Sequence, residues 1–191
     1  FLRRLVERAP QLETELSHGM SGSVLERVRR DELDVGFYLA PPGEGPGEAG
    51  DEIACRELTQ FHYHVIAPAG WGGRLAGAGW AQLAELPWIV TPPDSVHHRL
   101  LSGALAPLGE APRGVARVDQ EACMLDLVRA GVGLSLARDA LAMAERQERG
   151  LAVAEGLRLP CALCFIWRRS RGEEPVIGEA LAVLEQVWTN A

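Results

Sequence analysis

The feature of this sequence that most constrains its fold is a regular alternation between short strand-like and helical segments. Short apolar runs bounded by Gly and Pro are typical of buried strands, and apolar residues three and four positions apart are typical of helices. Such alternation favours an α/β fold in which helices cover a largely parallel sheet. The expected helices are 1–9, a helix from the turn at 18–22 to about residue 30, 80–86, 97–108, 121–130, 138–148 and 175–189. The expected strands are 12–16, 34–39, 53–68, 88–91, 114–118, 134–136, 151–154 and 159–167.

Segment 12–39 has the pattern of one strand-helix-strand unit, for which we expect parallel pairing of its two strands. In the helix of this unit, Ser23 and Glu26 have the spacing of a capping box, and Ser21 is a competing N-cap. Residues 41–50 contain four Gly and three Pro without apolar periodicity, which predicts a mobile surface loop that carries no site.

The composition is that of a globular protein with a net negative charge. All 19 cationic side chains are Arg, and 26 acidic residues bring the formal charge to -7, which argues against binding to nucleic-acid phosphates by this chain. The longest apolar run, 161–167, is too short to cross a bilayer, and no signal peptide is evident, so we expect a cytoplasmic protein without membrane contact. Because Phe1 is no initiator and already lies in a helical pattern, we also expect a preceding segment.

The four cysteines are expected to be buried thiols rather than a disulfide framework. Cys161 and Cys164 form a CxxC within a predicted strand, where residues three apart point to opposite faces, which disfavours a redox or zinc pair. Cys123 is expected on the inward face of helix 121–130, with Met124, Leu127 and Val128.

No pattern of nucleophilic catalysis, metal binding or nucleotide binding stands out. The sequence has no GxSxG elbow, and helix capping is the favoured role for Ser21. His62 and His64 share one strand face, but spacing alone does not bring them to His97 and His98, so we expect solvated histidines and no metal site. Glycine-rich phosphate loops are absent, and no cofactor is expected.

Polar residues gather instead at turns where a strand passes into a helix. Three such turns occur, at 20–21, 94–95 and 119–120, and Asp119 is placed to cap the helix that follows it. In a parallel α/β sheet these turns meet at the carboxyl ends of the strands, where free N–H groups and helix dipoles favour a small polar or anionic ligand. The pattern therefore predicts a binding cleft rather than a reaction centre.

With its segments placed, the chain resembles the effector-binding domain of LysR-type transcriptional regulators over nearly all of its length. Four motifs occur in the family's order and spacing, and the last, which matches "lVaaGlGi", is the most specific. They lie at Pro10 with 12–21, at 30–36, at 83–89 and at 127–134.

The resemblance implies two Rossmann-like lobes joined by two crossing strands, as in type 2 periplasmic binding proteins. Lobe I would comprise residues 1–60 and 161–191, and lobe II residues 61–160. It also implies that a winged helix-turn-helix, a linker helix and the first strand of lobe I precede this chain.

The resemblance further implies an effector-sensing domain, without enzymatic activity, that binds a small metabolite between the lobes to control DNA binding by a full-length protein. Expected partners are a small organic or aromatic acid, a second copy of the chain in a homodimer or higher oligomer, and DNA through the preceding domain alone. Helices 1–9 and 121–130 would form the dimer contact. The expected effector contacts are Met20, Ser21, His64, Thr91, Asp94, Ser95, Val96 and Gln120.

Two departures from the family bear on the effector. Met20 stands where polar residues are common, and Gln120 where a small hydroxyl is common, so the effector is expected to be less hydroxyl-dependent or more apolar. The reactive cysteine of peroxide-sensing members has no counterpart in 94–101, which disfavours thiol-based sensing.

Two other classes of protein share this fold. A solute-binding protein of a transporter would be exported and would need no preceding DNA-binding domain. An enzyme would need a convergent acid/base pair, and the candidates Asp94, Asp119 and Glu121 have no evident partner in the sequence.

Overall fold

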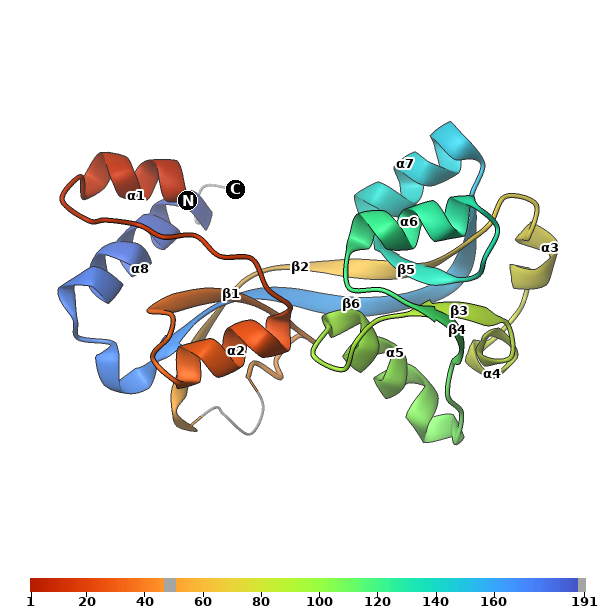
Figure 1. The fold of residues 1–191 in the computed structure, drawn as a ribbon, viewed down its shortest axis with the longest axis horizontal. Helices are drawn as coiled ribbons and strands as arrows, with labels where there is room; N and C mark the ends of the chain where they lie inside the picture. The colour runs from red at the N-terminus through yellow and green to blue at the C-terminus, as the bar shows by residue number, and fades with distance from the viewer. Residues whose placement is uncertain (47–50, 189–191) are drawn as a thin grey trace. The chain divides into compact units, whose positions relative to one another are not determined.

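The computed structural model describes residues 1–46 and 51–188 (Figure 1). Its internal contacts divide the chain into two compact units, one of residues 1–59 and 162–191 and one of residues 60–161. Two long strands, β2 (Ile53–Ala67) and β6 (Ala152–Arg168), each contribute to both units. In the sheet that contains them the strand order is β1-β6-β2-β5, where β1 is Val35–Ala40 and β5 is Ser135–Arg138.

The first unit is built on β1 (Val35–Ala40), which pairs antiparallel with β6 so that Phe37 lies opposite Phe165. Its core contains Val28, Ile53 and Ile166, all almost completely buried. Helix α1 lies beside α8, and Arg8 of α1 donates to Glu179 of α8 at 2.6 Å (Figure 1). The helices of this unit are α1 (Leu2–Arg8), α2 (Ser21–Arg29), the 3-10 turn η3 (Arg169–Arg171) and α8 (Pro175–Trp188).

The expected strand 12–16 is wrong, and so is the parallel pairing that depended on it. These residues are extended coil, and Leu16 is 74% exposed. Residues 13–15 line a groove of about 550 Å³, which is also lined by Asp34 and Val35 at the start of β1. The alternation of this segment is genuine, but a strand also requires a hydrogen-bonding neighbour. Within the described residues, β1 pairs with β6 instead, in the antiparallel sense.

The capping predictions for α2 are also wrong. The helix begins after Met20, whose side chain makes no capping hydrogen bond. The Ser21 hydroxyl instead accepts a hydrogen bond from the backbone N–H of Leu39 at 3.2 Å. Ser23 is the third residue of the helix and not its N-cap, so it forms no capping box with Glu26, whose carboxylate accepts a hydrogen bond from Arg29 at 3.0 Å. The helix therefore begins three residues earlier than a capping box at Ser23 predicts.

The second unit combines a parallel pair, β3 and β4, with the antiparallel pair β2 and β5. A parallel bridge from Trp88 to Leu134 connects β3 to the segment before β5. The core beneath α6 and α7 contains Ile66, Ile89 and Val128. The elements of this unit are α3 (Gly72–Leu75), α4 (Trp80–Ala84), β3 (Pro87–Val90), α5 (Val96–Leu105), the 3-10 turn η2 (Ala106–Leu108), β4 (Arg113–Arg117), α6 (Glu121–Arg129), β5 (Ser135–Arg138) and α7 (Asp139–Arg149).

Smaller predictions also need correction. The expected strands 151–154 and 159–167 are one strand, β6, which passes through Gly156 at a φ of +81°. On α6 the buried face carries Met124, Leu125 and Val128, whereas Cys123 is exposed. Within the predicted mobile loop, residues 47–50 lie outside the described residues.

Candidate functional site

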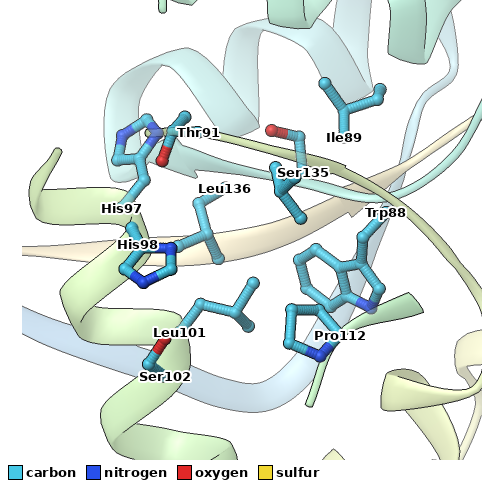
Figure 2. Close-up of a pocket in the computed structure, with 11 residues that line it drawn as sticks. Trp88, Ile89, Thr91, His97, His98, Leu101, Ser102, Pro112, Ser135 and Leu136 are labelled. Atoms are coloured by element: carbon cyan, nitrogen blue, oxygen red, sulfur yellow. The ribbon is translucent and has the colours of Figure 1, made fainter. Parts of the chain in front are cut away.

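A small pocket lies where β3 ends and α5 begins (Figure 2). Its volume is about 20 Å³, which is room for one water molecule rather than for a metabolite. All of its walls belong to the second unit. The lining residues are Trp88, Ile89, Val90, Thr91, His97, His98, Leu101, Ser102, Pro112, Ser135 and Leu136.

Two polar atoms of this pocket are buried without a hydrogen-bond partner among the described residues. They are Oγ1 of Thr91 and Nδ1 of His97, on side chains that are 5% and 8% exposed. Figure 2 shows both at the end of the pocket away from Trp88. A third group, the Ser135 hydroxyl, donates only to the sulfur of Met124 at 3.6 Å, which is a weak acceptor. An unpaired buried polar atom costs about 1–3 kcal/mol, so these atoms mark a place where a polar molecule would bind favourably.

His97 is a neutral imidazole. Burial, assisted by the positive charge of Arg138, lowers the pKa of His97 to about 4. Its ring packs edge-on against Tyr63, with the centroids 4.6 Å apart. A neutral imidazole has one donor and one acceptor nitrogen, so Nδ1 can offer a ligand either role according to the tautomer.

Tyr63 connects this pocket to a cationic side chain. The Nε–H of Arg138 donates to the Tyr63 hydroxyl at 3.3 Å, and the guanidinium carbon lies 4.8 Å from the centroid of the Phe61 ring. Burial raises the pKa of Tyr63 to about 12, despite the opposing effect of Arg138. The hydroxyl therefore stays protonated at neutral pH.

The turn before α5 contains four of the expected effector contacts. Thr91 lines the pocket. Ser95 is the N-cap of α5, and its Oγ accepts a hydrogen bond from the backbone N–H of His97 at 3.2 Å, which leaves the hydroxyl proton available to a ligand. Val96 is buried and Asp94 is exposed.

The other four expected contacts are not among the residues that line this pocket. The Nε2–H of His64 donates to the carboxylate of Asp139 at 2.6 Å, and as the neighbour of Tyr63 in β2 His64 points to the opposite face of the strand. Gln120 is an exposed N-cap of α6 whose side chain makes no capping bond, and Asp119, the expected cap, lies one residue too early. Met20 and Ser21 belong to the first unit.

The sequence analysis missed Tyr63, Ser135 and Arg138, and considered His97 only as a metal ligand. Tyr63 and Arg138 are direct neighbours in the antiparallel register of β2 and β5, although they are far apart in the sequence. Their own residue types gave no signal, because a Tyr in a strand and an Arg at a strand end are both ordinary.

The structure also shows the surroundings of the candidate metal ligands and of the cysteines. In the described parts of the chain, no group of three or more His, Cys, Asp or Glu side chains is arranged to hold a metal ion. None of the four cysteines forms a disulfide, and Cys161 and Cys164 are buried whereas Cys55 is half-buried. A helix long and apolar enough to span a bilayer does not occur between residues 1 and 46 or 51 and 188.

An α/β topology with a pocket of unpartnered polar atoms at the start of a helix is typical of small-molecule-binding domains. The fold and the pocket place this chain in that class. The sequence profile of the LysR substrate binding domain matches residues 1–189. The chain belongs to this family, whose members are effector-sensing domains of transcriptional regulators rather than enzymes. The expectation of an effector-binding domain is confirmed, and the solute-binding alternative is not favoured.

A curated relative is the HTH-type transcriptional regulator IlvR of Caulobacter vibrioides, which is 27% identical over 139 residues. The match covers 72% of this chain and 46% of IlvR, so the chain spans less than half of that relative.

Solved structures show the same fold. The regulatory domain of CcmR from Synechocystis PCC6803, in complex with 2-PG, has a TM-score of 0.76 at 15% identity, covering 99% of this chain and 89% of that one. The effector-binding domain of QuiR, in complex with shikimate, has a TM-score of 0.71 at 14% identity, covering 99% and 90%. Full-length CbnR in complex with its target DNA has a TM-score of 0.65 at 19% identity, covering 97% of this chain and 64% of that one.

Proposed function

We propose that this chain is the effector-binding domain of a cytoplasmic bacterial transcription factor, and that its effector is a small organic acid that it binds without transforming. This proposal rests on two atoms, Oγ1 of Thr91 and Nδ1 of His97. Both are buried polar atoms without a hydrogen-bond partner among the described residues, and both residues line the same pocket. In the full-length protein, DNA would be contacted through a separate winged helix-turn-helix, since this chain has a net charge of -7. Complexes of two regulators with this fold, one with shikimate and one with 2-PG, are consistent with an acidic effector.

The small volume of the pocket suggests how binding would be sensed. A cavity of about 20 Å³ cannot hold a metabolite, so an effector that enters it beside His97 must displace part of the pocket wall, whereas Thr91 also lines a more open groove of about 520 Å³. A ligand that binds the opened pocket and not the closed one has a different affinity for the two states. This difference is what shifts a conformational equilibrium.

We further propose that residues 1–60 with 161–191 form one lobe and residues 61–160 the other, and that two chains associate through α1 and α6. The internal contacts of the chain divide it between residues 59 and 60 and again between residues 161 and 162, which supports these lobes. Val6 of α1 is 47% exposed and Cys123 of α6 is exposed, which leaves apolar side chains available on both helices. Ser95, Val96, Asp94 and Gln120 stay proposed as effector contacts, together with Met20 and Ser21, whereas the pairing of His64 with Asp139 makes it the weakest candidate.

The test is a thermal-shift and calorimetric screen of small carboxylic acids, shikimate included, against the wild-type chain and Thr91→Val. Valine has nearly the shape of threonine but lacks the hydroxyl, so the affinity for an effector should fall about ten-fold, as for a lost hydrogen bond to a charged ligand. Thr59→Val, an exposed position of β2, is the matched control and should bind as the wild type does.

Two results would contradict this proposal. One is the absence of any ligand in a broad metabolite screen. The other is a ligand that binds Thr91→Val and Thr59→Val with equal affinity. Ser21→Ala and Ser95→Ala test the remaining contacts, and unchanged binding in both would restrict these hydroxyls to their observed bonds with backbone N–H groups.

A further inference from the structure

We infer that Arg138, held by Tyr63 and Phe61, is the anion anchor of the effector site and selects ligands that carry a carboxylate. This inference rests on the proposed function, because it assigns the ligand class and one recognition residue of the same site. Neither the family motifs nor the sequence analysis singled out this arginine.

The first observation is the position of Arg138 relative to the pocket. Arg138 and Leu136 are two residues apart on β5, so their side chains lie on the same face of the strand. Leu136 lines the pocket. Tyr63, the partner of Arg138 in the register, packs on His97, which also lines the pocket. The guanidinium is therefore joined to the unpartnered polar atoms through one continuous row of side chains.

The second observation is that Arg138 forms no ion pair with a carboxylate of the described residues, although Glu121 acts on it at longer range. Many arginines of this chain pair with carboxylates, as Arg129 and Arg171 do. Arg138 is exposed and, among residues 1–46 and 51–188, has no carboxylate within ion-pair distance. Its contacts are a neutral hydroxyl and an aromatic ring. Its remaining N–H groups are therefore available to a ligand.

The third observation is that these two contacts hold the guanidinium in place. The Tyr63 hydroxyl occupies only the Nε–H, and the ring of Phe61 lies beside the guanidinium carbon. A guanidinium fixed at one donor and against one ring keeps the paired donors that match the two oxygens of a carboxylate. An arginine restrained before binding also loses less conformational entropy when the ligand arrives.

The charge balance at Arg138 favours a monoanion. Glu121, at the start of α6, interacts electrostatically with both Tyr63 and Arg138 and offsets part of the positive charge. The single charge of one guanidinium neutralises a carboxylate monoanion in full and a phosphate dianion only in half. We therefore assign a carboxylate, and not a phosphate, as the anchored group.

The experiment measures binding of benzoate, benzamide and phenyl phosphate, and of any carboxylate from the functional screen with its primary amide, by calorimetry or ligand-observed NMR. Each probe is titrated into the wild type, Arg138→Gln, Arg138→Lys and Arg158→Gln. Arg158 is an exposed arginine of β6 in the same unit and serves as the matched control. Circular dichroism of each variant checks that it is folded.

We expect a carboxylate to bind the wild type at least about ten-fold more tightly than its amide, because charge-assisted bonds are about twice as strong as neutral ones. Arg138→Gln should remove this preference, Arg138→Lys should retain part of it, and Arg158→Gln should leave it unchanged. If Arg138→Gln does not fold, Arg138→Lys carries the test, since it keeps the charge and loses the paired donors.

Three results would overturn the inference. They are carboxylates that bind no better than their amides, an unchanged preference in Arg138→Gln and Arg138→Lys, and tighter binding of phenyl phosphate than of benzoate. A neutral ligand whose binding depends on Thr91 but not on Arg138 would refute the anchor while leaving the proposed function intact. Loss of dependence on Thr91 would refute the proposed function itself.

Discussion

Both carboxylate oxygens of Glu145 accept hydrogen bonds from the guanidinium of Arg129, one from Nε at 2.9 Å and the other from Nη2. This pair joins α7 to α6, and Glu145 is only 4% exposed although it is charged. The bond to Arg129, despite the opposing effect of burial, lowers the pKa of Glu145. A buried carboxylate is tolerated here because a single guanidinium donates a hydrogen bond to each of its two oxygens.

Replacing Glu145 by Gln should lower the thermal midpoint of the chain by several degrees, because Arg129 would lose the more buried of its two charged partners and keep only the exposed Asp126. Glu148→Gln, on an exposed position of the same helix, is the control and should leave the midpoint nearly unchanged. Differential scanning calorimetry provides the measurement. Equal midpoints for the two variants would show that the pair contributes nothing to stability.

His97 predicts a dependence of stability on pH. Its pKa is about 4 in the folded chain, whereas an unfolded histidine has a pKa of about 6.5. Between these values the unfolded chain binds a proton that the folded chain does not, so the free energy of unfolding falls as the pH decreases from about 6.5 to 4. The loss should reach roughly 3 kcal/mol over this window.

The measurement is urea unfolding at several pH values for the wild type, His97→Gln and His18→Gln. His97→Gln should have a shallower pH dependence in this window, and His18→Gln, an exposed position of the first unit, should follow the wild type. Parallel curves for all three proteins would mean that His97 is not held neutral by burial.

Gly133 is required for steric reasons. A Cβ at this position would collide with the carbonyl oxygen of Pro87 and lie 2.8 Å from its carbonyl carbon, at the place where β3 meets the start of β5. Gly133→Ala should therefore destabilise the second unit by about 2–3 kcal/mol. A Cβ at Gly103 of α5 meets nothing within 4 Å, so Gly103→Ala should be neutral or stabilising by about 0.5–1 kcal/mol. Chemical denaturation of both variants tests the contrast, which would fail if Gly133→Ala were as stable as Gly103→Ala.

The proposed contact through α1 and α6 can be tested with a matched pair of valines. Val6 of α1 and Val115 of β4 are 47% and 46% exposed. Val6→Asp places a charge in the proposed interface and should raise the dimer dissociation constant at least about ten-fold, whereas Val115→Asp should not change it. Sedimentation at a protein concentration of roughly tens of micromolar reports the oligomeric state. Weak interfaces assemble in this concentration range. A wild-type monomer, or dimers that persist in Val6→Asp, would contradict this interface.

Much of the fold follows from local patterns in the sequence. The alternation of elements predicted most helices and strands, because apolar periodicity records which face of a segment is buried. The "lVaaGlGi" motif at 127–134 also has a visible physical basis, since Gly133 must pass close to Pro87. Residues 12–16 show where a local pattern is insufficient. Their alternation suits a strand, yet no strand pairs with them in the described chain.

The sequence by itself determined the α/β class and the family, because propensity, periodicity and motif spacing are properties of neighbouring residues, and it predicted the turn before α5 as a place for a ligand. Only the tertiary structure decided that Tyr63 lies opposite Arg138, that Ser21 binds the backbone of Leu39, and that His97 is buried and neutral. These relationships depend on strand register and on burial by distant segments. The chain acquires both only when elements far apart in the sequence pack together.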